Sequence, residues 1–100
     1  MKEKIIVSLD FPSLHEAESV ISKTYDLVGA FKVGMELFYA AGTRILDSIQ
    51  KVGGKIFLDL KLHDIPNTVA SALKILKKYG IWMTNVHVAG GKSMLSAAAE

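Results

Sequence analysis

Two carboxylates and a lysine lie close together in the segment 55–69, whose sequence is KIFLDLKLHDIPNTV. Asp59 and Lys61 interrupt an apolar run, and Asp64 follows three residues after the lysine. Because strand side chains alternate between two faces, Asp59 and Lys61 are expected to point the same way. A lysine between two acids has its protonated form favoured, so this segment can provide a fixed positive charge and a proton donor.

The same pattern has an alternative explanation that involves no chemistry. An acid and a lysine two positions apart are typical of the solvated face of a strand. The opposite face is wholly apolar, as expected if helices cover it, and consists of Ile56, Leu58 and Leu60. Since the residue before a proline is disfavoured in helices, the strand should end near Lys61 and a helix should begin near Pro66 or Asn67.

Strand-like and helix-like segments alternate along the whole chain. Short apolar runs bounded by turn residues predict strands at 4–10, 30–33, 56–61 and 83–88. Helical periodicity and end signals predict helices at 13–25, 43–52, 66–79 and 93–100, with a short helical turn at 36–41. Ser13 and Glu16 fit a capping box for the first helix, and Thr43 can cap the second.

Polar side chains recur at the C-terminal end of each expected strand. They are Ser8 and Asp10, then Lys32, then Asp59 and Lys61, then Asn85 and His87. In α/β barrels this end of the strands carries the catalytic groups. The alternation therefore predicts an α/β fold of the (β/α)-barrel, or TIM-barrel, type. A closed barrel needs about eight strands and roughly 250 residues, so residues 1–100 are expected to supply the first four βα units, the N-terminal half of a single barrel domain.

Composition limits the other classes of function. Lys and Arg total 12, Asp and Glu total 10, and the two signs are mixed along the chain, which argues against a nucleic-acid partner. Cysteine is absent, which excludes disulfides and thiolate metal sites. The apolar run near the N-terminus is too short for a signal-peptide core or a membrane span. A soluble cytoplasmic protein with no membrane partner is therefore expected.

Four motifs together resemble the orotidine 5′-phosphate decarboxylase family. They are SLDF at 8–11, FKVG at 31–34, DLKLHDIPNT at 59–68 and NVHVAGG at 85–91, in the order and at spacings compatible with that family. The third motif is the specific one, and the resemblance covers the whole chain. It implies that orotidine 5′-monophosphate loses carbon dioxide to give uridine 5′-monophosphate in de novo pyrimidine biosynthesis. It also implies that the reaction uses neither a metal nor an organic cofactor.

The resemblance implies roles for particular residues and a homodimer with shared active sites. Lys61 matches the proton donor to the ring carbon that loses carbon dioxide, and Asp59 matches the carboxylate beside the departing group. Lys32 and Asp64 complete an alternating row of charges, with Asp64 reaching the active site of the partner subunit. The implied substrate-binding residues are Asp10, Lys32, Asp59, Lys61, Asp64, Ile65 and Thr68. Among these, Asp10, Lys32 and Thr68 correspond to ribose contacts, Thr68 from across the dimer.

Two other functions stay open at this point. The first is a magnesium-dependent sugar-phosphate decarboxylase or aldolase of the same superfamily, in which an acid on the second strand helps to hold the metal. This chain has Lys32 on that strand, which argues against magnesium. The second is a non-catalytic half-barrel that serves as an assembly module. Open strand edges invite pairing, so the 100-residue chain is expected to pair with a copy of itself or with the missing half. It is also expected to be inactive without the phosphate-holding loops of later strands.

Overall fold

The computed structural model describes residues 4–86 and 88–99 of the chain. Strands and helices alternate in the predicted order. The strands are β1 (Ile6–Ser8), β2 (Ala30–Gly34), β3 (Lys55–Leu62) and β4 (Met83–Val86). The helices are α1 (Leu14–Thr24), α2 (Met35–Ala41), α3 (Arg44–Lys51), α4 (Pro66–Lys78) and α5 (Lys92–Ala99), with a 3₁₀ turn, η2 (Val88–Gly90), before α5.

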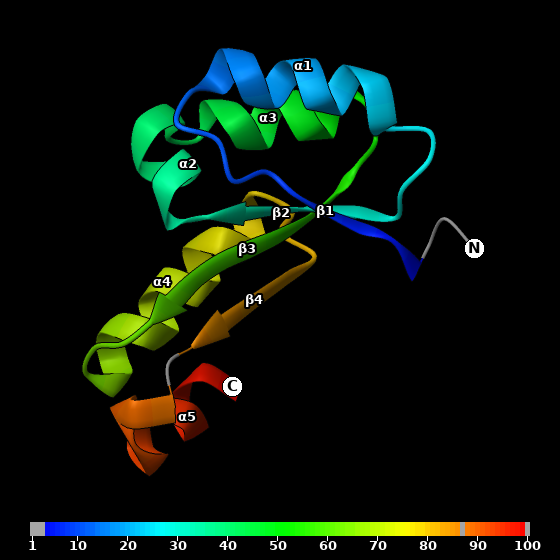
Figure 1. Ribbon diagram of the computed structural model, residues 1–100. Coiled ribbons are helices and arrows are strands. Elements are labelled where there is room, and N and C mark those ends of the chain that lie inside the picture. The colour runs from blue at the N-terminus through cyan, green and yellow to red at the C-terminus, as the bar shows by residue number, and fades with distance from the viewer. Residues whose placement is uncertain (1–3, 87, 100) are drawn as a thin grey trace.

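The strands form one parallel sheet in the order β1-β2-β3-β4. Parallel neighbours need crossover connections, and helices supply them between successive strands. In Figure 1, α1, α2 and α3 gather over one end of the sheet, while α4 and α5 lie toward the β4 end. The register pairs Ser8 with Lys32 and Gly34 with Asp59. The C-terminal ends of the strands therefore meet at one edge of the sheet, as the barrel prediction requires.

The hydrophobic core lies between the sheet and the helices. Alternate residues of β2 and β3 are almost fully buried in it, namely Phe31, Val33, Ile56 and Leu58. Helices α1 and α3 contribute the other large part of the core with Ala17, Ile21, Ile45, Leu46 and Ile49. Because a strand's side chains alternate, burial of these residues turns Lys32 and Asp59 to the opposite face. The core thus fixes which face of the sheet presents the polar groups.

The helix boundaries agree with the sequence predictions, with one exception in the capping. Ser13 has extended backbone and its hydroxyl accepts a hydrogen bond from the Glu16 amide at 3.3 Å, as the capping box predicts. Thr43 precedes α3, but its side chain forms no capping hydrogen bond, so that prediction is wrong. Its backbone is already helical (φ −71°, ψ −9°), whereas a side-chain cap needs extended geometry. Helix α4 begins at Pro66, as predicted.

Two strands are shorter than predicted. β1 covers Ile6–Ser8 rather than residues 4–10, although backbone hydrogen bonds at Ile5 and Leu9 continue its pairing with the β2 segment. β4 covers Met83–Val86, and Val88, the last residue of the predicted strand, belongs to η2 instead. His87, expected at the end of this strand, lies outside the described residues. Across residues 4–86 and 88–99, no helix is long and apolar enough to cross a membrane.

Candidate active site

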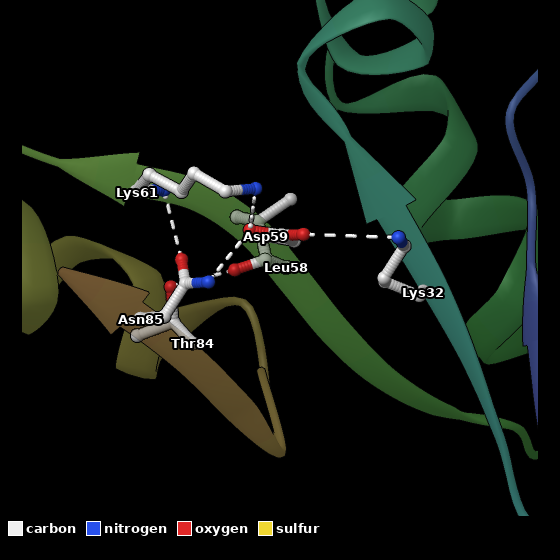
Figure 2. Close-up of polar contacts among 6 residues, drawn as sticks. All are labelled: Lys32, Leu58, Asp59, Lys61, Thr84 and Asn85. Atoms are coloured by element: carbon white, nitrogen blue, oxygen red, sulfur yellow. Dashed lines mark hydrogen bonds and ion pairs between the residues drawn. The ribbon is translucent and has the colours of Figure 1, made fainter. Parts of the chain in front are cut away.

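Asp59 is the centre of a charged cluster at the C-terminal end of the sheet. Among residues 4–86 and 88–99 it is the only charged or polar residue that is buried, with 8% of its surface exposed. Lys61 Nζ lies 2.9 Å from its Oδ1, and Lys32 Nζ lies 3.8 Å from its Oδ2 (Figure 2). β3 and β2 therefore bring one cation to each oxygen of the same carboxylate. The explanation of this segment as a solvated strand face is wrong for Asp59.

Asn85, from the neighbouring strand β4, completes the surroundings of this carboxylate. Its Nδ2 donates a hydrogen bond to Asp59 Oδ1 at 2.6 Å, so that this oxygen accepts from both Asn85 and Lys61. The pKa of Asp59 is lowered, first by the hydrogen bond from Lys61 and next by that from Asn85. Burial acts in the opposite direction, while the charges of Lys61 and Lys32 lower the pKa further. Asp59 is thus held as an anion.

The backbone around Lys61 departs from regular strand geometry. Lys61 has φ +50°, and it is the single non-glycine residue with positive φ in the described chain. The β3–β4 register pairs Leu58 with Thr84 and Leu62 with Val86, with an irregularity in between. Four residue steps on β3 (58 to 62) thus lie against two on β4 (84 to 86). Lys61, whose side chain contacts Asp59, lies within this bulge-like irregularity, and bulges commonly re-aim side chains beside active sites.

The side chain of Asn85 also contacts the bulge directly. Its Oδ1 accepts a hydrogen bond from the Lys61 backbone amide at 2.8 Å. The next residue back on β4, Thr84, donates its hydroxyl to the Leu58 carbonyl at 2.7 Å (Figure 2). Sequence reasoning placed Asn85 at a strand end but gave it no role. Its place among the polar residues at the strand ends could have indicated a role. Its two contacts, however, depend on the irregular register between β3 and β4, which the sequence does not predict.

The remaining predicted site residues lie around this cluster. Asp10 follows β1 and is exposed; a Cβ atom placed on Gly34, the residue paired with Asp59, would lie 3.7 Å from Asp10 Oδ1. Asp10 Oδ1 therefore lies close to Gly34, the last residue of β2. It forms no ion pair within the part of the chain that the structure describes.

Asp64, Ile65 and Thr68 lie beyond β3, where the chain enters α4. All three are exposed, and Asp64 Oδ1 accepts a hydrogen bond from the Ile65 amide at 2.7 Å. Asp64 and Thr68 line an open cavity of about 310 Å³ together with Lys61. The other residues that line this cavity are Tyr39, Leu60, Leu62, His63, Val69 and Ala72. Among the described residues Asp64 joins no ion pair, so the fourth charge of the expected row is not assembled within this chain.

The cluster can hold an anion between two ammonium groups and present one of them to a ligand. The Lys61 side chain is 55% exposed and that of Lys32 is 25% exposed, whereas that of Asp59 is 11% exposed. Lys61 is thus accessible from solvent while its carboxylate partner is not. Within residues 4–86 and 88–99, no group of three His, Cys, Asp or Glu side chains is arranged to hold a metal ion.

Relatives of the chain share about half of its residues. A protein from Carboxydothermus hydrogenoformans named orotidine 5′-phosphate decarboxylase is 51% identical over 98% of this chain and 41% of its own length. One of the same name from Lactiplantibacillus plantarum is 52% identical over 98% of this chain and 42% of its own length. The chain thus spans about two fifths of the length of these curated relatives.

Solved structures agree with the sequence relatives. A crystal structure of an uncharacterized conserved protein from Geobacillus kaustophilus matches 95% of this chain and 44% of its own, with a TM-score of 0.88 and 48% identity. The crystal structure of orotidine 5′-phosphate decarboxylase from Lactobacillus acidophilus matches 94% of this chain and 42% of its own, with a TM-score of 0.81 and 45% identity. The prediction of the first βα units of a TIM-type barrel is confirmed.

One family model extends over nearly all of the sequence. It is the model described as "Orotidine 5'-phosphate decarboxylase / HUMPS family", and it matches residues 3–100. All four quoted motifs fall within that match. The chain therefore belongs to the orotidine 5′-phosphate decarboxylase / HUMPS family.

Proposed function

We propose that this chain provides the proton-donating part of an active site that decarboxylates orotidine 5′-monophosphate in pyrimidine biosynthesis. The observation that carries the proposal is the buried Asp59 carboxylate, held as an anion between Lys61 and Lys32 at the C-terminal edge of a parallel sheet. The names of relatives about 50% identical to the chain favour this reaction over others of the family.

The proposed chemistry uses the exposed ammonium of Lys61. The bond between the substrate's ring and its carboxyl carbon breaks, carbon dioxide leaves, and the electron pair stays on the ring carbon. That carbon takes a proton from Lys61 Nζ, and the lysine regains one from solvent. No adjacent carbonyl delocalises the electron pair, so a positive charge already in place is the main aid available to the protein.

Asp59 has two tasks in this proposal. Its Oδ1 holds Lys61 Nζ at 2.9 Å, which fixes the direction of the proton donor before substrate binds. In the proposal the substrate carboxylate binds beside Lys61, close to the negative charge of Asp59, so departure of carbon dioxide relieves repulsion. Lys32, 3.8 Å from the other oxygen, balances the charge of Asp59 and can contact the ribose.

Lys32 also distinguishes this proposal from the magnesium-dependent members of the superfamily. Its ammonium lies 3.8 Å from Asp59 Oδ2, so it would repel a divalent cation bound to that oxygen. Two like charges would then compete for one oxygen. We therefore propose a reaction without metal or organic cofactor, in which Asp10, Asp64, Ile65 and Thr68 line the substrate or partner side of the site.

We further propose that residues 1–100 act as the N-terminal half of one barrel domain, in a cytoplasmic homodimer with shared active sites. In TIM barrels the phosphate group is commonly held by loops after the seventh and eighth strands. The described residues form the four strands β1 to β4, which the proposal assigns to the first half of the barrel. Turnover should accordingly need the later strands, and the chain by itself should show little decarboxylase activity.

The test is a chimera in which this chain replaces the matching region of the Carboxydothermus hydrogenoformans relative. The chimera should release labelled carbon dioxide from carboxyl-labelled orotidine 5′-monophosphate, as the parent relative does in parallel. Lys61→Ala should lower kcat far more than it raises KM, because the proton donor acts mainly in the transition state. Turnover should survive exhaustive chelation. A folded chimera with no turnover, or one that needs magnesium and acts on sugar phosphates, would overturn the proposal.

A further inference from the structure

The geometry points to Asn85 as a positioning residue, which fixes both the Asp59 carboxylate and the backbone of Lys61 (Figure 2). The contacts stand independently of any reaction. Their kinetic consequence rests on the proposed function, because it assumes that Lys61 donates a proton to substrate. Asn85 itself is not assigned any contact with substrate.

Both ends of the Asn85 amide are used. A carboxamide offers an acceptor oxygen and a donor nitrogen at a fixed separation. Oδ1 accepts from the Lys61 amide at 2.8 Å, while Nδ2 donates to Asp59 Oδ1 at 2.6 Å. Neither alanine nor aspartate can make both contacts, since alanine has no polar group and an ionised aspartate has no donor. The pair of contacts therefore requires an amide at this position.

The bulge explains why a side chain is needed here. In a regular ladder, a backbone amide finds its acceptor on the neighbouring strand. β3 has four residue steps opposite two of β4, so regular pairing is interrupted between Leu58 and Leu62. Asn85 Oδ1 serves as the acceptor for the Lys61 amide within this interruption. An acceptor at that point stabilises the positive φ that directs Lys61 toward Asp59.

The partners of the Asp59 carboxylate are distributed over its two oxygens. Asn85 and Lys61 both donate to Oδ1, whereas Lys32 lies nearest to Oδ2. Removing the Asn85 amide would free the carboxylate to rotate and would release the Lys61 backbone at the same time. Misplacement of a catalytic group by about 1 Å can cost on the order of 100-fold in rate. We expect Asn85→Ala to lower kcat by roughly 10- to 100-fold with a smaller change in KM.

The first test measures the placement without substrate, on the chain itself. Carboxyl ¹³C NMR gives the pKa of Asp59, and amide hydrogen exchange reports the hydrogen bond of Lys61. In Asn85→Ala, the pKa of Asp59 should rise toward its ordinary value of 3.8, and the Lys61 amide should exchange faster. In Asn85→Asp, the amide should keep more of its protection, while the added negative charge raises the pKa of Asp59 further.

Thr84→Val is the matched control. It removes another side-chain hydrogen bond between β4 and β3, to Leu58, and touches neither Asp59 nor Lys61. Both readouts should stay at their parent values in this variant. Unchanged readouts in Asn85→Ala, or equal changes in Asn85→Ala and Thr84→Val, would overturn the inference, because general loosening of the strands would then explain the data.

The second test measures turnover of the same variants in the chimera. If the parent chimera turns over and Asn85→Ala keeps its kcat, the positioning role is wrong while the proposed reaction stands. If the parent chimera folds and does not act on orotidine 5′-monophosphate, the proposed reaction is wrong, and the NMR data still decide where Asn85 holds Asp59 and Lys61. The two failures are therefore distinguishable.

Discussion

The left-handed backbone at Lys61 predicts that glycine at this position gives a more stable protein than alanine, the reverse of the usual order within a strand. Lys61 has φ +50° in a strand whose other residues avoid positive φ. Lys61→Ala and Lys61→Gly both remove the ammonium and its contact with Asp59. They differ in the side chain that must tolerate this backbone. The difference between the two variants in free energy of unfolding therefore isolates the local strain.

The expected size follows from two opposing terms. An L-residue in the left-handed region costs roughly 1–2 kcal/mol, which glycine does not incur. Glycine in turn lowers the free energy of unfolding by about 0.5–1 kcal/mol relative to alanine, because it gives the unfolded chain more conformational freedom. Lys61→Gly should therefore be more stable than Lys61→Ala by up to about 1.5 kcal/mol, and by about 0.75 kcal/mol at the midpoints of the two ranges. For a chain of 100 residues, that corresponds to a few degrees in Tm, on the order of 2–8 °C.

Lys55 gives the matched control within the same strand. It is exposed, opens β3 and is not among the residues with positive φ. Lys55→Gly should be less stable than Lys55→Ala by about 0.5–1 kcal/mol, the usual order. The four variants can be compared by urea unfolding, with m-values checked for constancy. Alanine more stable than glycine at both positions would refute the assignment of strain to Lys61.

Three further predictions concern the charges and the edges of the sheet. The lowered pKa of Asp59 contributes stability that is present above the unfolded-state pKa, near 3.8, and is lost as the pH falls through the lower folded-state pKa. Unfolding at a series of pH values should show this loss in the parent chain and a smaller one in Asp59→Asn. Mixing inactive Lys61→Ala and Asp64→Asn chimeras should restore some activity if Asp64 serves the partner's site; no recovery in proven heterodimers would place it in its own. Light scattering should show self-association of the chain, because Ile6 and Met83 are 42% and 38% exposed on the outer strands β1 and β4, whereas a monodisperse monomer would contradict it.

Local patterns were sufficient to predict most of the fold. Period-two burial in β2 and β3, the capping serine before α1 and the proline that opens α4 are each encoded within a few residues. The outer strands were predicted less well. β1 and β4 each have one neighbour in the sheet, so their lengths depend on pairing rather than on apolar runs. Val88, the last residue of the predicted fourth strand, belongs to η2 instead.

The candidate site was predictable in its residues but not in its geometry. Motif and periodicity brought Lys32, Asp59 and Lys61 to one edge of the sheet, and the structure brings these three together. Asn85 was missed because its role depends on the register between β3 and β4, which pairs residues distant in sequence. The positive φ of Lys61 was missed because positive φ is usually predicted from a glycine or an asparagine, and neither stands at this position.

These departures from local rules support the proposed catalytic explanation of the acid–lysine pattern over that of a solvated strand face. A solvated strand face needs neither a buried carboxylate nor a lysine in a left-handed backbone, because water can satisfy both groups in regular geometry. At Asp59 and Lys61 the chain instead combines burial, a bulge and positive φ within three residues. Each of these costs stability unless surrounding contacts compensate it. Three features that reduce stability occur together at the C-terminal end of a barrel strand. A catalytic role for these residues explains this better than a role in folding does.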